Sequence, residues 1–90
     1  MDYKTYNGWA NYATWRVNLE IFDGMDVVDY FGIDVNNWHP YDLGNILKDY
    51  AQEVIEMTSQ EGLARDYALA FLDEVDFREI AQLKMDEITT

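Results

Sequence analysis

Carboxylates are the side chains in this chain whose number and spacing could support a chemical or binding function. Four of them recur at i, i+7, i+11 and i+14, and we call them the acidic row: Asp42, Asp49, Glu53 and Glu56. On an α-helix this spacing places them on one face, about 10, 6 and 4.5 Å apart along the axis. Phosphates along a DNA strand are separated by distances of the same order. The row could therefore occupy a protein groove that binds a nucleic-acid backbone, or it could be a solvated helix face with ion pairs around Lys48.

A second group of carboxylates surrounds a glycine-containing segment and raises the question of a calcium site: Asp23, Asp26, Asp29 and Asp34. An EF-hand loop needs glycine at its sixth position and glutamate at its twelfth. Counted from Asp23, those positions hold Val28 and Asp34, so the loop does not fit. We expect helix caps and a solvated acidic patch here, and no metal.

The residue types that usually carry catalysis are scarce. His39 is the only histidine and directly precedes Pro40, which predicts a helix cap rather than an acid–base role. Ser59 is the only serine and has no G-x-S-x-G motif around it. The adjacent acids at 73–74 and 86–87 point in different directions on a helix, so neither pair forms a dyad. We therefore expect a binding protein without catalytic residues or cofactors rather than an enzyme.

The net charge of the chain limits the kinds of partner that it could bind. Eighteen acidic and six basic residues give a net charge of −12, which excludes ordinary nucleic-acid binding and disfavours anionic membranes. No uncharged stretch approaches the roughly 18 residues of a membrane span, and the N-terminus lacks a secretory pattern. With no cysteine, neither disulfides nor thiolate metal sites exist. We expect a cytoplasmic protein whose charge either aids solubility or attracts a basic partner.

Hydrophobic periodicity predicts a mainly α-helical chain that forms one domain over residues 1–90. A first helix should begin after Asn11, carry Tyr12, Trp15, Leu19 and Phe22 on its apolar side, and end at residues 23–24. A short helical turn should follow from Asp26 to Gly32, and residues 33–39 should form a loop.

The second half of the chain contains the longest predicted helix, from Pro40 to about Gln60. Its apolar stripe comprises Leu43, Ile46, Leu47, Tyr50, Val54 and Met57, and Gly44 within it suggests close helix packing. Further helices are expected from Leu63 to Glu74, with Leu63, Tyr67, Ala70 and Phe71 on one side, and from Asp76 onward, where Glu79 completes a capping box.

Together these segments predict a compact bundle of about four helices plus a short fifth element, with an irregular N-terminal arm over residues 1–10. The pair Asn7-Gly8 predicts a turn in that arm. The arm could also pair with residues 33–38 in a small β-ribbon.

Aromatic residues make up 16% of the chain, more than a core of this size needs. Some of them should lie near the surface, where aromatic side chains often anchor protein interfaces. The candidates are Tyr3, Tyr6, Trp9, Tyr41 and Tyr67.

The segment from Tyr6 to Trp15, YNGWANYATW, is the most specific motif in the chain. It resembles the N-terminus of a family of small uncharacterised proteins from bacteriophages and mobile elements, which reads approximately Y-N-G-W-x-N-Y-x-T-W. The resemblance implies a phage or mobile-element origin and supplies no activity. The motif itself predicts a structural role, with Asn11 as a helix cap and Trp9 packed against Trp15.

Charge and resemblance together predict a phage-type inhibitor of a host defence complex, of the anti-CRISPR or anti-restriction kind, that acts in the host cytoplasm. Its partner would be a basic nucleic-acid-binding protein of the host, bound through the acidic row. The alternative is an accessory phage protein that binds a partner through an aromatic surface, without mimicry of DNA. The oligomeric state is left open.

Overall fold

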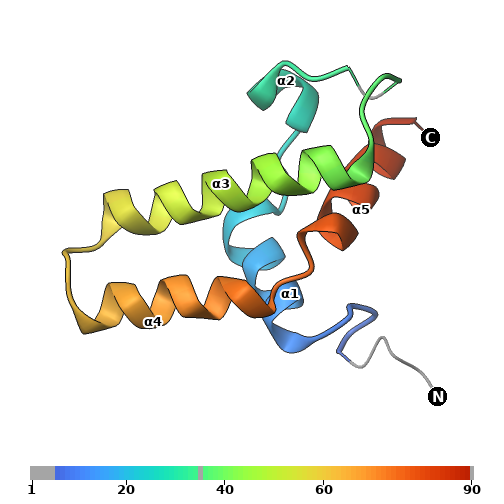
Figure 1. Ribbon diagram of the computed structural model, residues 1–90. Coiled ribbons are helices and arrows are strands. Elements are labelled where there is room, and N and C mark those ends of the chain that lie inside the picture. The colour runs from blue at the N-terminus through green and yellow to red at the C-terminus, as the bar shows by residue number, and fades with distance from the viewer. Residues whose placement is uncertain (1–5, 35, 90) are drawn as a thin grey trace.

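The computed structural model describes residues 6–34 and 36–89, which form a helical bundle (Figure 1). In chain order its elements are α1 (Tyr12–Val17), the π-helical η1 (Asn18–Phe22), α2 (Val27–Phe31), α3 (Pro40–Thr58), α4 (Leu63–Phe71), the 3₁₀-helical η2 (Leu72–Glu74) and α5 (Phe77–Thr89). The mainly α prediction is confirmed.

The N-terminal arm contains the predicted turn. Asn7 and Gly8 both have positive φ, 47° and 86°, and the flanking Tyr6 and Trp9 exchange two backbone hydrogen bonds of 3.2 and 2.7 Å. This isolated bridge is the only β pairing among the described residues. The predicted ribbon between residues 1–10 and 33–38 is therefore wrong for that part of the chain, and residues 1–5 and 35 lie outside it.

The first helix follows its predicted limits but changes geometry halfway. Val17 and Phe22 are both buried and lie five residues apart, which on a continuous α-helix would place them on different sides. The π-helical turn of η1, with its i→i+5 bonds, brings both into the core. The buried side of the segment also differs from the predicted apolar stripe: Tyr12 and Leu19 are exposed, whereas Ala13 and Thr14 are buried.

The short helix α2 has the predicted limits. The Asp26 carboxylate accepts hydrogen bonds from the backbone N–H groups of Val28 and Asp29 at its start. Gly32 ends it in the left-handed region at a φ of 69°, a conformation that residues with a Cβ adopt at a cost.

The longest helix, α3, begins at Pro40 as predicted and ends at Thr58, within a turn of the expected limit. His39 caps it, because its Nδ1 accepts a hydrogen bond of 3.0 Å from the Tyr41 N–H. Leu43 and Leu47 of the predicted stripe are buried, whereas Met57 near the C-terminal end is 76% exposed.

The pairing of α3 with α5 is the most extensive helix contact, and Gly44 makes it possible. A Cβ on Gly44 would lie 3.2 Å from the Arg78 nitrogen and 3.2 Å from the Phe77 carbonyl carbon, both backbone atoms of α5. The close approach suggested by this glycine is confirmed.

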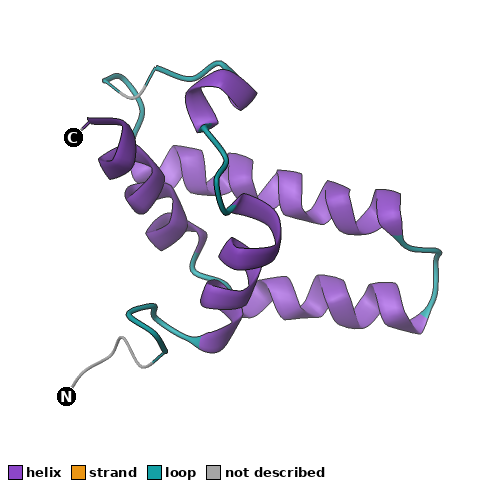
Figure 2. Cartoon of the chain, turned by 180° about the vertical axis from the view of Figure 1, so that it is seen from behind, coloured by secondary structure: helices purple, strands orange, loops and turns teal. Residues whose placement is uncertain are grey.

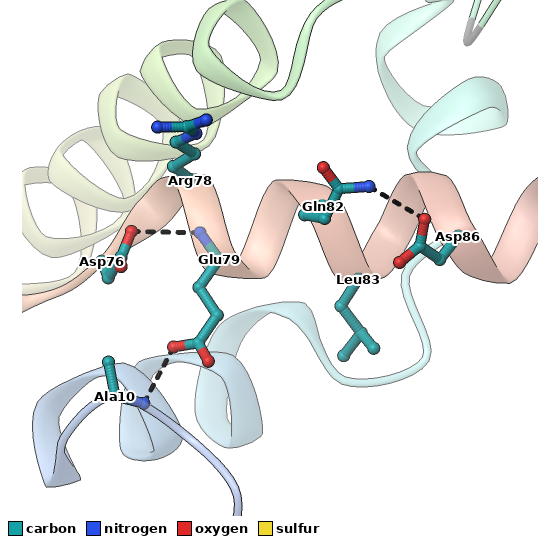
Figure 3. A pocket seen from close by; sticks show the side chains of 7 residues that line it. All are labelled: Ala10, Asp76, Arg78, Glu79, Gln82, Leu83 and Asp86. Carbon is teal, nitrogen blue, oxygen red and sulfur yellow. Dashed lines mark hydrogen bonds between the residues drawn. The ribbon is translucent and has the colours of Figure 1, made fainter. Parts of the chain in front are cut away.

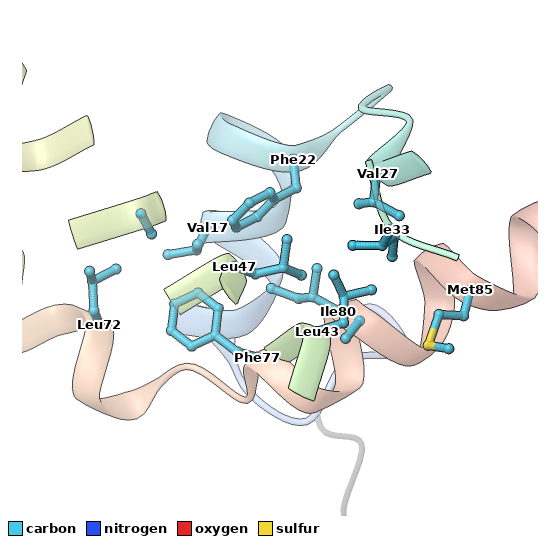
Figure 4. Packing of buried hydrophobic residues seen from close by; sticks show 12 residues of the cluster. Val17, Phe22, Val27, Ile33, Leu43, Leu47, Leu72, Phe77, Ile80 and Met85 are labelled. Atoms are coloured by element: carbon cyan, nitrogen blue, oxygen red, sulfur yellow. The ribbon is translucent and has the colours of Figure 1, made fainter. Parts of the chain in front are cut away.

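The core lies where α3, α5 and the α1–η1 segment meet (Figure 4). Phe22 and Phe77 contact one another there in an edge-to-face arrangement, with ring centroids 6.4 Å apart. Leu47 and Ile80, both fully buried, fill the space beside them.

Helices α3 and α4 form an antiparallel hairpin that extends away from this core (Figures 1 and 2). Arg65 fixes its turn by donating to the carbonyl oxygens of Glu56, at 2.7 Å, and Ser59. The molecule is consequently flat, with extents of 41 × 37 × 20 Å.

Candidate functional site

The acidic row lies on one exposed side of α3. All four of its carboxylates are exposed, and the buried residues Leu43, Leu47 and Ala51 lie on the opposite side of the helix. Within the described residues, none of the four side chains forms an ion pair or a hydrogen bond. The alternative expectation of ion pairs around Lys48 is wrong for the same part of the chain.

Few basic side chains are left to offset this charge, because three of the five described ones already interact with other groups of the protein. Arg16 pairs with Glu20 at 2.9 Å, and Arg65 is held at the hairpin turn. Lys84 is 4% exposed, and its Nζ lies 3.8 Å from a Glu87 carboxylate oxygen. The exposed surface is therefore predominantly acidic.

Two tyrosine hydroxyls meet beside the row. Tyr30 of α2 and Tyr50 of α3 lie 2.8 Å apart between their hydroxyl oxygens. The hydrogen bond with Tyr30, together with partial burial, raises the pKa of Tyr50. This phenol therefore stays neutral at physiological pH, and the negative charge of α3 comes from its carboxylates.

Two of the four carboxylates considered for calcium form local hydrogen bonds. Asp26 caps α2, and Asp34 accepts hydrogen bonds from the Asn36 N–H at 3.0 Å and the Asn37 side chain at 2.7 Å. Among the residues that the structure describes, no three potential ligands gather into a metal site.

The N-terminal motif connects two helix starts that are distant in sequence. The Asn11 carboxamide oxygen caps α1 by accepting from the Thr14 N–H at 2.8 Å, and its Nδ2 donates to the Glu74 carbonyl at 2.7 Å. Buried Thr14 in turn accepts a hydrogen bond of 2.8 Å from the Asp76 N–H through its hydroxyl. The motif thus fastens α1 to the junction between η2 and α5.

This arrangement alters the predicted capping box. Asp76 does accept from the Glu79 N–H at 3.1 Å, but Glu79 does not return a bond to the Asp76 nitrogen, whose partner is Thr14. The Glu79 carboxylate instead accepts a hydrogen bond of 2.9 Å from the Ala10 N–H. Figure 3 shows this contact at the edge of a pocket of about 430 Å³ beside α5.

The two tryptophans of the motif do not pack on each other as predicted. Trp15 contacts Tyr6 and Tyr12, with ring centroids 5.0 and 5.8 Å apart, whereas Trp9 packs against the core. Both are half-buried. The two side chains therefore belong to separate contacts.

An apolar groove between η1 and the α3–α4 hairpin was not predicted. It encloses about 440 Å³, and its lining comprises Arg16, Val17, Glu20, Ile21, Ile55, Tyr67, Ala68, Phe71 and Leu72. Helical spacing correctly placed Tyr67 and Phe71 on one side of their helix, and Tyr67 is one of the tyrosines that were expected near the surface. Tyr67 is 70% exposed and Leu63 67%. Tyr41, at 62%, confirms the expectation that some tyrosines reach the surface.

None of the helices in the described part of the chain has the length and apolar character needed to cross a membrane. Comparison with curated proteins and with solved structures yields no match to this sequence. A family model does match, over residues 2–90, and its description is a family of unknown function, DUF7249. Because the match spans nearly the whole chain, the protein belongs to the family of unknown function DUF7249.

Proposed function

We propose that this protein is a phage-type inhibitor that binds a basic nucleic-acid-binding protein of a host defence complex, of the anti-CRISPR or anti-restriction kind. The acidic row would take the place of phosphates in the basic groove of that partner. The observation that carries the proposal is the row itself: four exposed carboxylates on one side of a 19-residue helix, with no ion pair or hydrogen bond to any of the residues that the structure describes.

Charge density supports the same proposal. Spread along the 41 Å longest dimension, a net charge of −12 corresponds to about one charge per 3.4 Å, close to the axial spacing of phosphates on one DNA strand. Electrostatic steering by such a body should raise its association rate with a basic partner. That gain should shrink as ionic strength rises.

The test is a competition between this protein and labelled duplex DNA for a basic protein captured from host lysate. In the variant Asp49→Lys/Glu53→Lys the net charge falls from −12 to −8. Inhibition of DNA binding should weaken at least tenfold, which requires about 1.4 kcal/mol from the two residues together.

The matched control is Asp73→Lys/Glu74→Lys, which makes the same change in net charge at two exposed residues of η2. This control should retain most of the inhibition. If both variants lost inhibition equally, net charge and not the position of the acidic row would be responsible. If neither variant lost inhibition, the acidic row would be only a solvated helix face.

The alternative proposal is an accessory phage protein that binds a protein partner through an aromatic surface. The exposed tyrosines favour it, Tyr67 above all. Salt separates the two functions, because binding by charge should weaken steeply with ionic strength and aromatic docking much less.

A further inference from the structure

The apolar groove is open along the hairpin. Figure 2 shows η1 and α1 crossing the hairpin near its attached end, while no other element crosses the end that carries the α3–α4 turn. The groove has three helical walls: η1 contributes Ile21, α3 contributes Ile55, and α4 contributes Tyr67 and Phe71. Its fourth side faces solvent.

The wall formed by α4 is unusually exposed for an amphipathic helix. None of its nine residues is buried, although Leu63, Tyr67 and Phe71 repeat at the spacing that normally faces a core. Burying an apolar side chain stabilises by roughly 25 cal/mol per Å² of area removed from water. A partner that covers this side would gain that stabilisation without rearranging the bundle.

We propose that the groove binds an amphipathic helix of a partner protein, with apolar residues facing the groove and basic residues on its flanks. A helix matches the shape of the site, because the three walls are themselves helices and a fourth can pack beside them. The i, i+3, i+4 and i+7 side chains of such a partner helix can all reach one groove. This proposal does not depend on the acidic row, which lies on the outward side of α3.

Charge identifies the occupant as basic. Arg16 and Glu20 on the groove wall pair with each other at 2.9 Å, so the charge beside the groove comes from the exposed acids Glu61 and Asp66 of the same hairpin. A second copy of this chain would bring another net charge of −12 to the same surface, and repulsion of this kind keeps proteins monomeric. A basic helix meets attraction at the same positions.

The probe is a synthetic helical peptide of leucine and lysine, with leucine at i, i+3, i+4 and i+7 over three heptads. Two comparison peptides have the same composition in scrambled order, or glutamate in place of lysine. Binding is measured by fluorescence anisotropy at physiological salt and at 0.5 M NaCl. We expect the leucine–lysine peptide to bind best and to keep measurable affinity at the higher salt, because the apolar contact is not screened.

The variant Tyr67→Ala removes an apolar wall without changing charge, and we expect it to weaken binding at least tenfold. Tyr41→Ala is the matched control, since Tyr41 is similarly exposed, at 62%, and does not line the groove. Circular dichroism and thermal unfolding verify that both variants fold. Tyr41→Ala should bind like the unchanged protein.

Three results would overturn the proposal. The scrambled peptide could bind as well as the helical one, or Tyr67→Ala could bind unchanged, and in either case the attraction would be charge alone. Alternatively, sedimentation could show a dimer that Tyr67→Ala dissociates, and the occupant would be a second copy. Because both single variants leave the acidic row intact, failure here is separate from failure of the proposed inhibition.

Discussion

The two halves of α3 have different neighbours. Comparing them shows which region stabilises the fold and which region is available to a partner. Its N-terminal half packs against α5, where Phe77, Ile80 and Ala81 are buried. Its C-terminal half pairs with α4, which has no buried residue. The first region therefore holds the core, and the second presents apolar surface at little cost to the fold.

The largest expected difference in unfolding free energy is between leucine-to-alanine variants in these two regions. Leu47 is fully buried, so Leu47→Ala should lower the free energy of unfolding by about 2–5 kcal/mol. Leu63→Ala, at a residue 67% exposed, should change it by no more than about 0.5 kcal/mol. Urea unfolding measures both. Comparable losses would mean that the outer part of the hairpin is covered in solution and that the contrast is false.

A smaller effect is expected where the N-terminal motif meets α5. Thr14→Val keeps the shape of this fully buried side chain but leaves the Asp76 N–H without its acceptor, which should lower the unfolding free energy by about 1–3 kcal/mol. Thr58→Val is the control, because its hydroxyl bonds to the Val54 carbonyl in an exposed position. If both variants unfolded at the same urea concentration, the link between α1 and α5 would add nothing to stability.

The smallest expected change in unfolding free energy is at Gly44, where α3 and α5 approach each other closely. Gly44→Ala should gain about 1 kcal/mol in helix propensity, but its Cβ would meet backbone atoms of Arg78 and Phe77 at 3.2 Å. Overpacking of this kind typically costs about 1–3 kcal/mol, so we expect net destabilisation of about 1 kcal/mol. Asn45→Ala, exposed on the same helix, should be neutral or slightly stabilising. A more stable Gly44→Ala protein would show that the two helices can separate freely.

Several features of the site follow from residues close together in sequence and were therefore predictable. The acidic row depends only on helical spacing along α3 and on the exposure of one side, and His39 and Asp26 cap the helices next to them. The groove was not predictable in this way. Its walls come from residues near position 20, near position 55 and near position 70. A pattern of neighbouring residues cannot predict that these distant segments come together.

The sequence alone determined the helical class, the helix limits and the turn at Asn7-Gly8, because caps, glycines and apolar periodicity act over a few residues. Only the tertiary structure decided that Val17 and Phe22 share the core through a π-helical turn, that Thr14 rather than Glu79 satisfies the Asp76 nitrogen, and that no residue of α4 is buried. These outcomes depend on which segments pack together, and that choice minimises the free energy of the whole chain rather than of any single helix.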